Sequence, residues 1–181
     1  MTLLQTKHPY DEVADQYDKL WSSPAALKED RQVMAKINFD RGDVLDIGCG
    51  TGLFLDHHRR CDGYLGIDPS SAMLEKLKAK HPKRMTMQAK FEDAIPKLTS
   101  VRFQLIVSLF GSPSYACPDA LLQARSMLTT GGRLICMFIA PGYEPETHRY
   151  ISNPPTLYQH RFEDYGWSCT FGNYIYTCYQ A

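Results

Sequence analysis

The stretch VLDIGCGTG, from Val44 to Gly52, restricts the possible fold more than any other part of the chain. Its first four residues suit a buried strand, and three glycines at alternating positions follow directly: Gly48, Gly50 and Gly52. Glycine at a strand-to-helix turn takes dihedrals that other residues avoid and lets a ligand approach the backbone. The stretch therefore predicts a nucleotide-like ligand at the first turn of an open α/β sheet, with a tight turn without ligand as the alternative.

Strand-like and helix-like segments alternate on both sides of this turn. In chain order these segments are residues 43–48, 53–60, 64–68, 71–80, 84–89, 103–110, 119–128 and 133–140. Gly131 and Gly132 are expected to stop the last helix. Such alternation is typical of a parallel sheet, and it predicts a Rossmann-like, doubly wound, mostly parallel α/β sheet with helices on both faces.

The two ends of the chain depart from this alternation. WSCTF (167–171) and YIYTCYQ (174–180) are strand-like and only two residues apart, which predicts a C-terminal antiparallel hairpin. Apolar residues at helical spacing predict one helix from Tyr10 to Leu20 and another over residues 25–37. We expect a single domain, residues 1–181, in which residues 1–40 form a helical cap.

Composition excludes several classes of function. Twenty Lys and Arg balance twenty Asp and Glu, so the net charge gives no attraction to nucleic acid or to an anionic membrane. The six cysteines form no C-x-x-C pair, which leaves no expected metal site or redox dithiol. The first residues, MTLLQTKHPYDEVADQYD, contain neither a long apolar run nor a small-residue cleavage site, and no stretch reaches membrane-spanning length, so we expect neither a secretory leader nor a membrane span. We expect a cytoplasmic protein with a small-molecule partner, and the oligomeric state stays open.

The acidic residue before the glycines discriminates between ligands. A dinucleotide fingerprint requires G-x-G-x-x-G, but position 53 is Leu. The stretch is instead D-x-G-x-G-x-G, with Asp46 on the strand. A carboxylate there repels a pyrophosphate and attracts positive charge. It favours S-adenosylmethionine, which carries an ammonium and a sulfonium, over NAD.

VLDIGCGTG, followed by GYLGIDPSSAML, resembles motifs one and two of class I S-adenosylmethionine-dependent methyltransferases. The resemblance continues through FQLIVSLFGSPSY and LTTGGRLI, and YDEVADQYD is similar to the family's N-terminal helix. It implies methyl transfer from S-adenosylmethionine to a small-molecule acceptor. A non-catalytic cofactor-binding subunit and, less favoured, an NAD-dependent oxidoreductase remain alternatives.

The resemblance also assigns cofactor-binding residues. It implies that the three glycines line the methionine and ribose portion and that Asp46 helps to hold the amino group, directly or through water. It also implies that Asp68 binds both ribose hydroxyls and that Met73 packs near the adenine. Asp68 could instead cap a helix, and Met73 could be core. The family's Gly-Asp-Ala after strand three is replaced by a segment whose Lys90 cannot accept the adenine hydrogen bond. Phe91 and Glu92 are then the adenine contacts, with plain surface roles as the alternative for Lys90 and Glu92.

The remaining candidates surround the methyl group. Ligands bind beyond the carboxyl ends of parallel strands, so Ser108 is expected beside the cofactor and Phe110 and Tyr115 in the acceptor pocket. Tyr10 and Tyr17 are expected to close over the sulfonium and the acceptor, with core packing as the alternative.

Other motifs carry less weight. His148, Arg149 and Tyr150 follow strand five, where a solvated loop is the more common explanation. NPPT, Asn153–Thr156, resembles the Asn-Pro-Pro-aromatic motif of DNA amino-methyltransferases, but it lacks the aromatic and follows the wrong strand. A sulfonium-bound methyl group needs mainly alignment, and the sequence selects no catalytic base.

Overall fold

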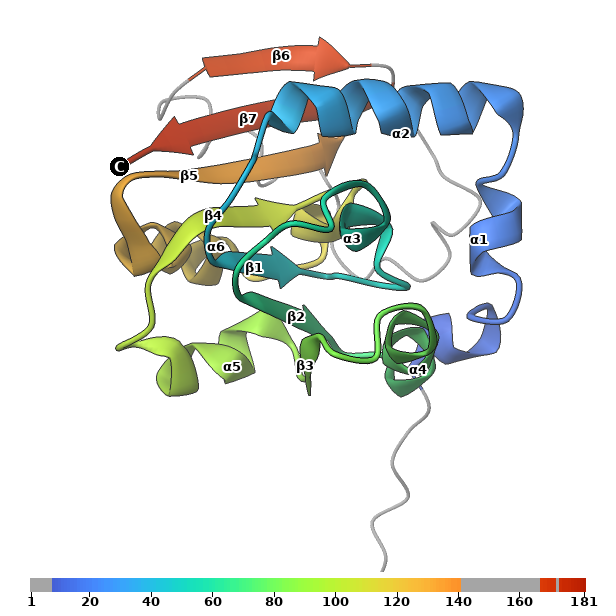
Figure 1. The fold of residues 1–181 in the computed structure, drawn as a ribbon, viewed down its shortest axis with the longest axis horizontal. Helices are drawn as coiled ribbons and strands as arrows, with labels where there is room; N and C mark the ends of the chain where they lie inside the picture. The colour runs from blue at the N-terminus through green and yellow to red at the C-terminus, as the bar shows by residue number, and fades with distance from the viewer. Residues whose placement is uncertain (1–7, 141–166, 172) are drawn as a thin grey trace, which may run out of the picture.

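The computed structural model describes residues 8–140, 167–171 and 173–181. Its centre is a seven-stranded sheet of order β3-β2-β1-β4-β5-β7-β6 (Figure 1). The strands are β1 Val44–Ile47, β2 Tyr64–Asp68, β3 Met85–Gln88, β4 Phe103–Ser108, β5 Leu128–Ile139, β6 Trp167–Phe171 and β7 Tyr174–Gln180. The first five are parallel, and β7 pairs antiparallel with both β5 and β6. The predicted doubly wound sheet and its C-terminal hairpin are confirmed.

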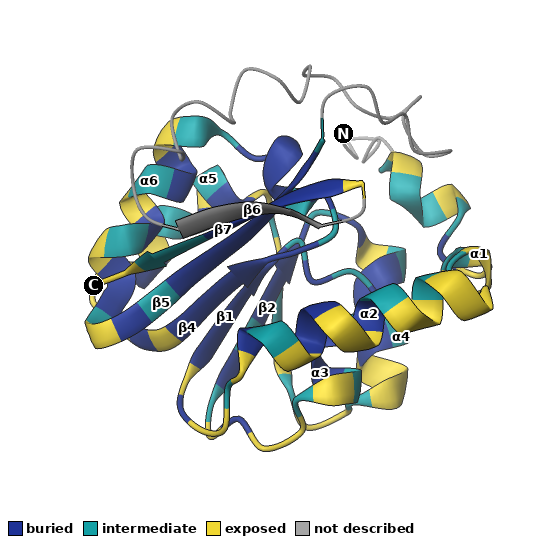
Figure 2. Cartoon of the chain, turned by 90° about the horizontal axis from the view of Figure 1, so that it is seen from above, coloured by how far each residue is buried: buried dark blue, intermediate teal, exposed yellow. Residues whose placement is uncertain are grey.

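Helices cover both faces of the sheet, as expected. The α-helices are α1 Tyr17–Leu20, α2 Pro24–Ile37, α3 Leu53–His57, α4 Ser71–Lys80, α5 Phe91–Leu98 and α6 Pro118–Ala124. One core joins α2, α3 and α4 to one face, and a second core joins α5 and α6 to the other. Neighbouring residues of β1 serve different cores, because Val44 faces the first and Leu45 the second. Figure 2 shows the central strands almost entirely buried between these layers.

The single N-terminal helix predicted from Tyr10 to Leu20 is wrong. The segment forms a short 3-10 helix, η1 Pro9–Glu12, then turns and continues as α1. The break fits the contacts of its acidic residues, since Asp11 and Asp18 bind different parts of the body, namely α4 and the glycine turn. Helix α2, by contrast, lies where predicted, to within one residue at its start.

Two further expectations between β3 and β5 need correction. Helix α5 was not predicted, because it is short and contains Pro96, although Phe91, Ala94 and Leu98 show the helical spacing on its buried side. Helix α6 ends at Ala124 and continues as a 3-10 turn, η3 Arg125–Met127. Strand β5 therefore already contains the two glycines expected to end that helix.

These glycines take part in the sheet. The Gly131 amide donates to the carbonyl of Ala181, and the Ala181 amide donates to that of Gly132. Gly131 has a φ of +75°, next to a register irregularity in the pairing of β4 with β5. Glycine here therefore permits a bulge rather than ending a helix.

The fold brings all the carboxyl ends of the parallel strands to one edge. In Figure 1 the arrowheads of β1, β2, β4 and β5 point toward the side on which α1 lies. A third 3-10 turn, η2 Ser112–Ser114, follows β4 at this edge. None of the described helices has the length and apolar character needed to cross a membrane.

Candidate active site

The three glycines form the turn between β1 and α3. All have positive φ: +71° at Gly48, +50° at Gly50 and +94° at Gly52. A β-carbon at Gly48 would lie 2.6 Å from that of Ser112, so only glycine, which has no side chain, fits at this position. No atom lies within 4 Å of a β-carbon placed at Gly50, which leaves its outer side open. The turn is therefore closely packed at its start and accessible in its middle.

Two buried carboxylates flank this turn. Asp46, on β1, is 4% exposed and accepts a hydrogen bond of 2.8 Å from the hydroxyl of Tyr64. Asp68 ends β2 and accepts 2.9 Å bonds from the amides of Gly50 and Ser70. The second carboxylate thus fixes both the glycine turn and the entry into α4.

Burial changes the protonation of both groups. It raises the pKa of Asp46 to about 7, against the opposing hydrogen bond from Tyr64. It likewise raises the pKa of Asp68 to about 6, although the two amide bonds oppose the shift. Carboxylates in this state gain from a cation or from hydroxyl donors that replace the lost water.

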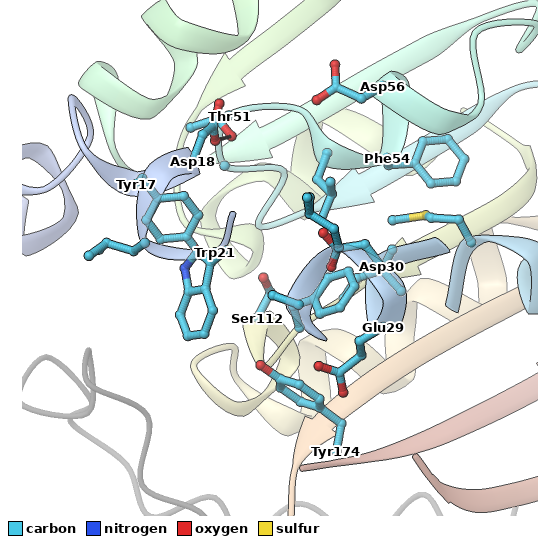
Figure 3. A pocket seen from close by; sticks show the side chains of 18 of the residues that line it. Tyr17, Asp18, Trp21, Glu29, Asp30, Thr51, Phe54, Asp56, Ser112 and Tyr174 are labelled. Atoms are coloured by element: carbon cyan, nitrogen blue, oxygen red, sulfur yellow. Dashed lines mark hydrogen bonds between the residues drawn. The ribbon is translucent and has the colours of Figure 1, made fainter. Parts of the chain in front are cut away.

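A cavity of about 910 Å³ lies over the glycine turn. Its lining comes from α1, α2, β1, the glycine turn, α3, the segment after β4 and the start of β7. Figure 3 shows Tyr17, Asp18 and Trp21 on one side of it. The volume lies in the range of small-molecule sites.

Five of the predicted site residues line this cavity: Tyr17, Asp46, Gly48, Gly50 and Phe110. Gly52 lies outside it and begins α3, where an added β-carbon would lie 3.0 Å from Leu77. Asp68 touches the turn through Gly50 rather than lining the cavity itself.

The structure places three other candidates in the interior. Ser108 is fully buried, and its hydroxyl donates to the carbonyl of Ile47, so it joins β4 to β1 instead of facing the cavity. Phe91 packs in the core beneath α5. Met73 is 2% exposed, near the start of α4. Glu92, next to Phe91, is half-buried and does not line the cavity.

The aromatic candidates meet near the N-terminal segment. The hydroxyl of Tyr10 lies 3.0 Å from that of Tyr115, and the ring of Tyr10 is edge-on to Tyr17 at 6.0 Å between centroids. Burial raises the pKa of Tyr17, with Tyr10 and Asp68 adding to the effect. The N-terminal segment thus reaches both the β4 end and the neighbourhood of Asp68.

Acidic side chains attach that segment to the body. Asp11 accepts hydrogen bonds from the Ser70 hydroxyl at 2.6 Å and from the Ala72 amide at 3.1 Å, at the start of α4. The hydroxyl of Thr51 donates to Asp18, which connects α1 to the glycine turn. These contacts hold the segment beside the turn.

Sequence reasoning missed the carboxylates that α2 brings to the cavity, Glu29 and Asp30. The signal was present, since Asp30 occupies the same helical stripe as Val33, Met34 and Ile37, and all four are buried. A charged residue within an apolar stripe indicates a site.

Some candidates lie outside the described residues: His148, Arg149, Tyr150 and the NPPT segment at Asn153–Thr156. Among the described residues, no group of three or more His, Cys, Asp and Glu side chains is arranged to hold a metal ion.

The site and fold match a known family. The family model described as a methyltransferase domain matches residues 20–175. The chain belongs to this family. An uncharacterised protein of Methanocaldococcus jannaschii is 32% identical over 131 residues, which cover 71% of this chain and 49% of that protein. The chain thus spans about half the length of the curated relative it matches.

Solved structures share the fold. The DhpI complex with S-adenosylhomocysteine (SAH) has a TM-score of 0.70 at 15% identity, covering 93% of this chain and 91% of DhpI. A Haemonchus contortus phosphoethanolamine N-methyltransferase has a TM-score of 0.66 at 14% identity, covering 95% of this chain and 48% of that one. The CcbJ methyltransferase of Streptomyces caelestis has a TM-score of 0.58 at 21% identity, covering 75% and 59%.

These findings confirm the predicted class. The family model shows a methyltransferase domain, and the solved structures share its Rossmann-like fold.

Proposed function

We propose that this methyltransferase domain transfers the methyl group to a small-molecule acceptor by in-line displacement, in the cavity between the glycine turn and α2. The observation that carries the proposal is the open middle of the turn, at Gly50, flanked by two buried carboxylates beside a cavity of about 910 Å³. The cavity lies at the carboxyl ends of the parallel strands, where open α/β sheets bind their ligands.

The residues around the turn fit S-adenosylmethionine. Asp46 and Asp68 are buried with raised pKa values, so positive charge or hydroxyl donors stabilise their ionised forms. The space over Gly50 is free of protein atoms within 4 Å of an added β-carbon. Asp46 would hold the ammonium group, and Asp68 the ribose hydroxyls.

When bound, the cofactor supplies a methyl group that its sulfonium already activates. The protein must then align the acceptor and exclude water. We assign these tasks to Tyr17 and Phe110, which line the cavity, and to Tyr10 and Tyr115, whose paired hydroxyls connect the N-terminal segment to the end of η2. The N-terminal region of residues 8–40 would act as the cap of a single domain.

Calorimetric titration with S-adenosylmethionine, with SAH and with NADH tests the cofactor assignment. We expect micromolar affinity for the two sulfur ligands and none for NADH. Incubation with S-adenosylmethionine carrying a labelled methyl group, with small-molecule extracts as acceptors, then tests transfer. Label that appears only in macromolecules would contradict the small-molecule proposal.

A further inference from the structure

The far end of the cavity is acidic. Glu29 and Asp30 line it from α2, and Phe110, Ser112 and Tyr174 line it from the end of β4 and the start of β7. Figure 3 shows the two carboxylates on the same side of the cavity as Tyr174 and Ser112, across from Trp21. This end adjoins the glycine turn at Ser112, whose hydroxyl donates a hydrogen bond of 3.1 Å to the carbonyl of Gly48.

Asp30 is the most unusual of these side chains. It is 8% exposed and lies on the apolar, core-facing stripe of α2. It makes no hydrogen bond or ion pair with any residue that the structure describes. Burial removes part of the hydration of this carboxylate, and a ligand that supplies positive charge compensates for that loss.

The other carboxylates of the cavity already have partners. Asp18 receives hydrogen bonds from Thr51 and Lys80, and Asp56 contacts Lys80 and His81. Asp46 receives one from Tyr64. Glu29, like Asp30, has no partner among the described residues.

In the described part of the cavity wall, little positive charge balances this pair. Of the described lining residues only Lys28 carries a positive charge, and its side chain is exposed. Burial raises the pKa of Asp30 to about 6, and the adjacent Glu29 adds to the shift while Arg31 opposes it. The local field at this end therefore favours a cation.

Aromatic rings complete the surroundings. Phe110 lies edge-on to Tyr174, with 5.8 Å between ring centroids and an interplanar angle of 89°. Trp21 lines the opposite side. Aromatic faces attract ammonium groups, most of all where water is excluded. Carboxylates together with aromatic rings are what an organic cation requires.

We propose that the methyl acceptor is an amine with an apolar body, and that Asp30, assisted by Glu29, binds its ammonium group at the α2 end of the cavity. The inference rests on the proposed methyl-transfer function and adds the class of acceptor.

The chemistry of an amine acceptor balances with these residues. The ammonium nitrogen first loses a proton to a carboxylate oxygen of Asp30. The freed lone pair then forms the bond from nitrogen to the methyl carbon, while the carbon–sulfur bond breaks and its electron pair stays on sulfur. Asp30 thus neutralises the charge of the acceptor and receives its proton.

The test measures binding to the full chain saturated with SAH, so that it does not depend on turnover. The probes are amine and alcohol pairs of matched shape: 2-phenylethylamine against 2-phenylethanol, and pentylamine against 1-pentanol. Dissociation constants come from ligand-detected NMR titrations at neutral pH. We expect each amine to bind about tenfold more tightly than its alcohol, as charge-assisted hydrogen bonds imply.

The variants are Asp30→Asn and, as a matched control, Asp40→Asn, an exposed carboxylate beyond the end of α2. Asp30→Asn should remove the preference for amines and leave the affinity for SAH within about twofold, on the same energetic scale. Asp40→Asn should change neither. Glu29→Gln should lower the preference only in part.

The proposal is overturned if amines bind no more tightly than alcohols, or if the preference survives in Asp30→Asn. It is also overturned if Asp30→Asn abolishes binding of SAH while the protein stays folded, because Asp30 would then belong to the cofactor site. Failure of the wild-type chain to bind SAH at all would instead refute the proposed function.

Discussion

The two ends of the cavity hold their carboxylates in different ways. At the glycine turn, Asp46 and Asp68 accept hydrogen bonds from Tyr64, Gly50 and Ser70. At the α2 end, Glu29 and Asp30 have no partner among the described residues. The first end is preorganised by local backbone geometry. At the second end, the ligand must supply the positive charge that pairs with the carboxylates. Cofactor binding and acceptor selection should therefore respond to different substitutions.

The largest expected effect is at Asp68. Replacing it with Ala removes the proposed contacts to the ribose and releases the amides of Gly50 and Ser70. The lost hydrogen bonds to this charged group contribute about 3 kcal/mol in total. S-adenosylmethionine should therefore bind roughly a hundredfold more weakly. Calorimetric titration measures the change, with Glu75→Ala, an exposed residue of α4, as the control. Unchanged affinity in Asp68→Ala would remove the main support for the cofactor end.

Gly48→Ala tests the close packing of the same end. The new β-carbon would lie 2.6 Å from the β-carbon of Ser112, at a φ of +71°. Gly131→Ala is a matched control, since its φ is +75° but no atom lies within 4 Å of its added β-carbon. Overpacking should make Gly48→Ala less stable than Gly131→Ala by about 2 kcal/mol. Urea unfolding measures the difference in the free energy of unfolding. Equal stabilities of the two variants would show that the turn shifts to accommodate the added β-carbon at little cost.

The pH dependence of cofactor binding should be intermediate in size. Asp46 and Asp68, with pKa values of about 7 and about 6, are ionised only as the pH rises through those values. A cationic ligand should therefore bind more tightly at pH 7.5 than at pH 5. The gain should be about tenfold for each unit by which the bound ligand lowers the pKa of a carboxylate. Titrations across this range in Asp46→Asn should show a smaller dependence. A flat profile in the wild-type chain would mean that neither carboxylate meets the positive charge.

The smallest expected effect concerns Asp30 without ligand. Its pKa, about 6, lies above the value of 3.8 in the absence of folding, so the folded state keeps a proton that the unfolded state releases. The free energy of unfolding should fall as the pH rises from about 4 to 6. Asp30→Asn has no such titration. At pH 7 its free energy of unfolding should therefore be at least that of the wild type, and higher by up to about 1 kcal/mol, or about 2–4 °C in Tm. A marked loss of stability would instead mean that Asp30 has a structural role.

Local patterns were sufficient for most of the sheet and for the glycine turn. The residues of α4 and of the strands β6 and β7 lie where their sequences predict, because period-two and helical spacing act over a few residues. Two predictions failed. The short helix α5 was not predicted because it contains Pro96, and Gly131, expected to end a helix, instead permits a bulge in β5. In both cases contacts with distant strands outweigh the local signal.

The sequence by itself determined the class of this protein, because the acidic strand end and the three alternating glycines lie within one short stretch and need no distant contact to be recognised. Tertiary structure alone decided the other end of the cavity. Glu29 lies on α2 and Tyr174 on β7, far apart in the chain, and only the packing of α2 over the C-terminal strands brings them to one wall. The same packing buries the carboxylate of Asp30, and the residue type alone does not predict that burial.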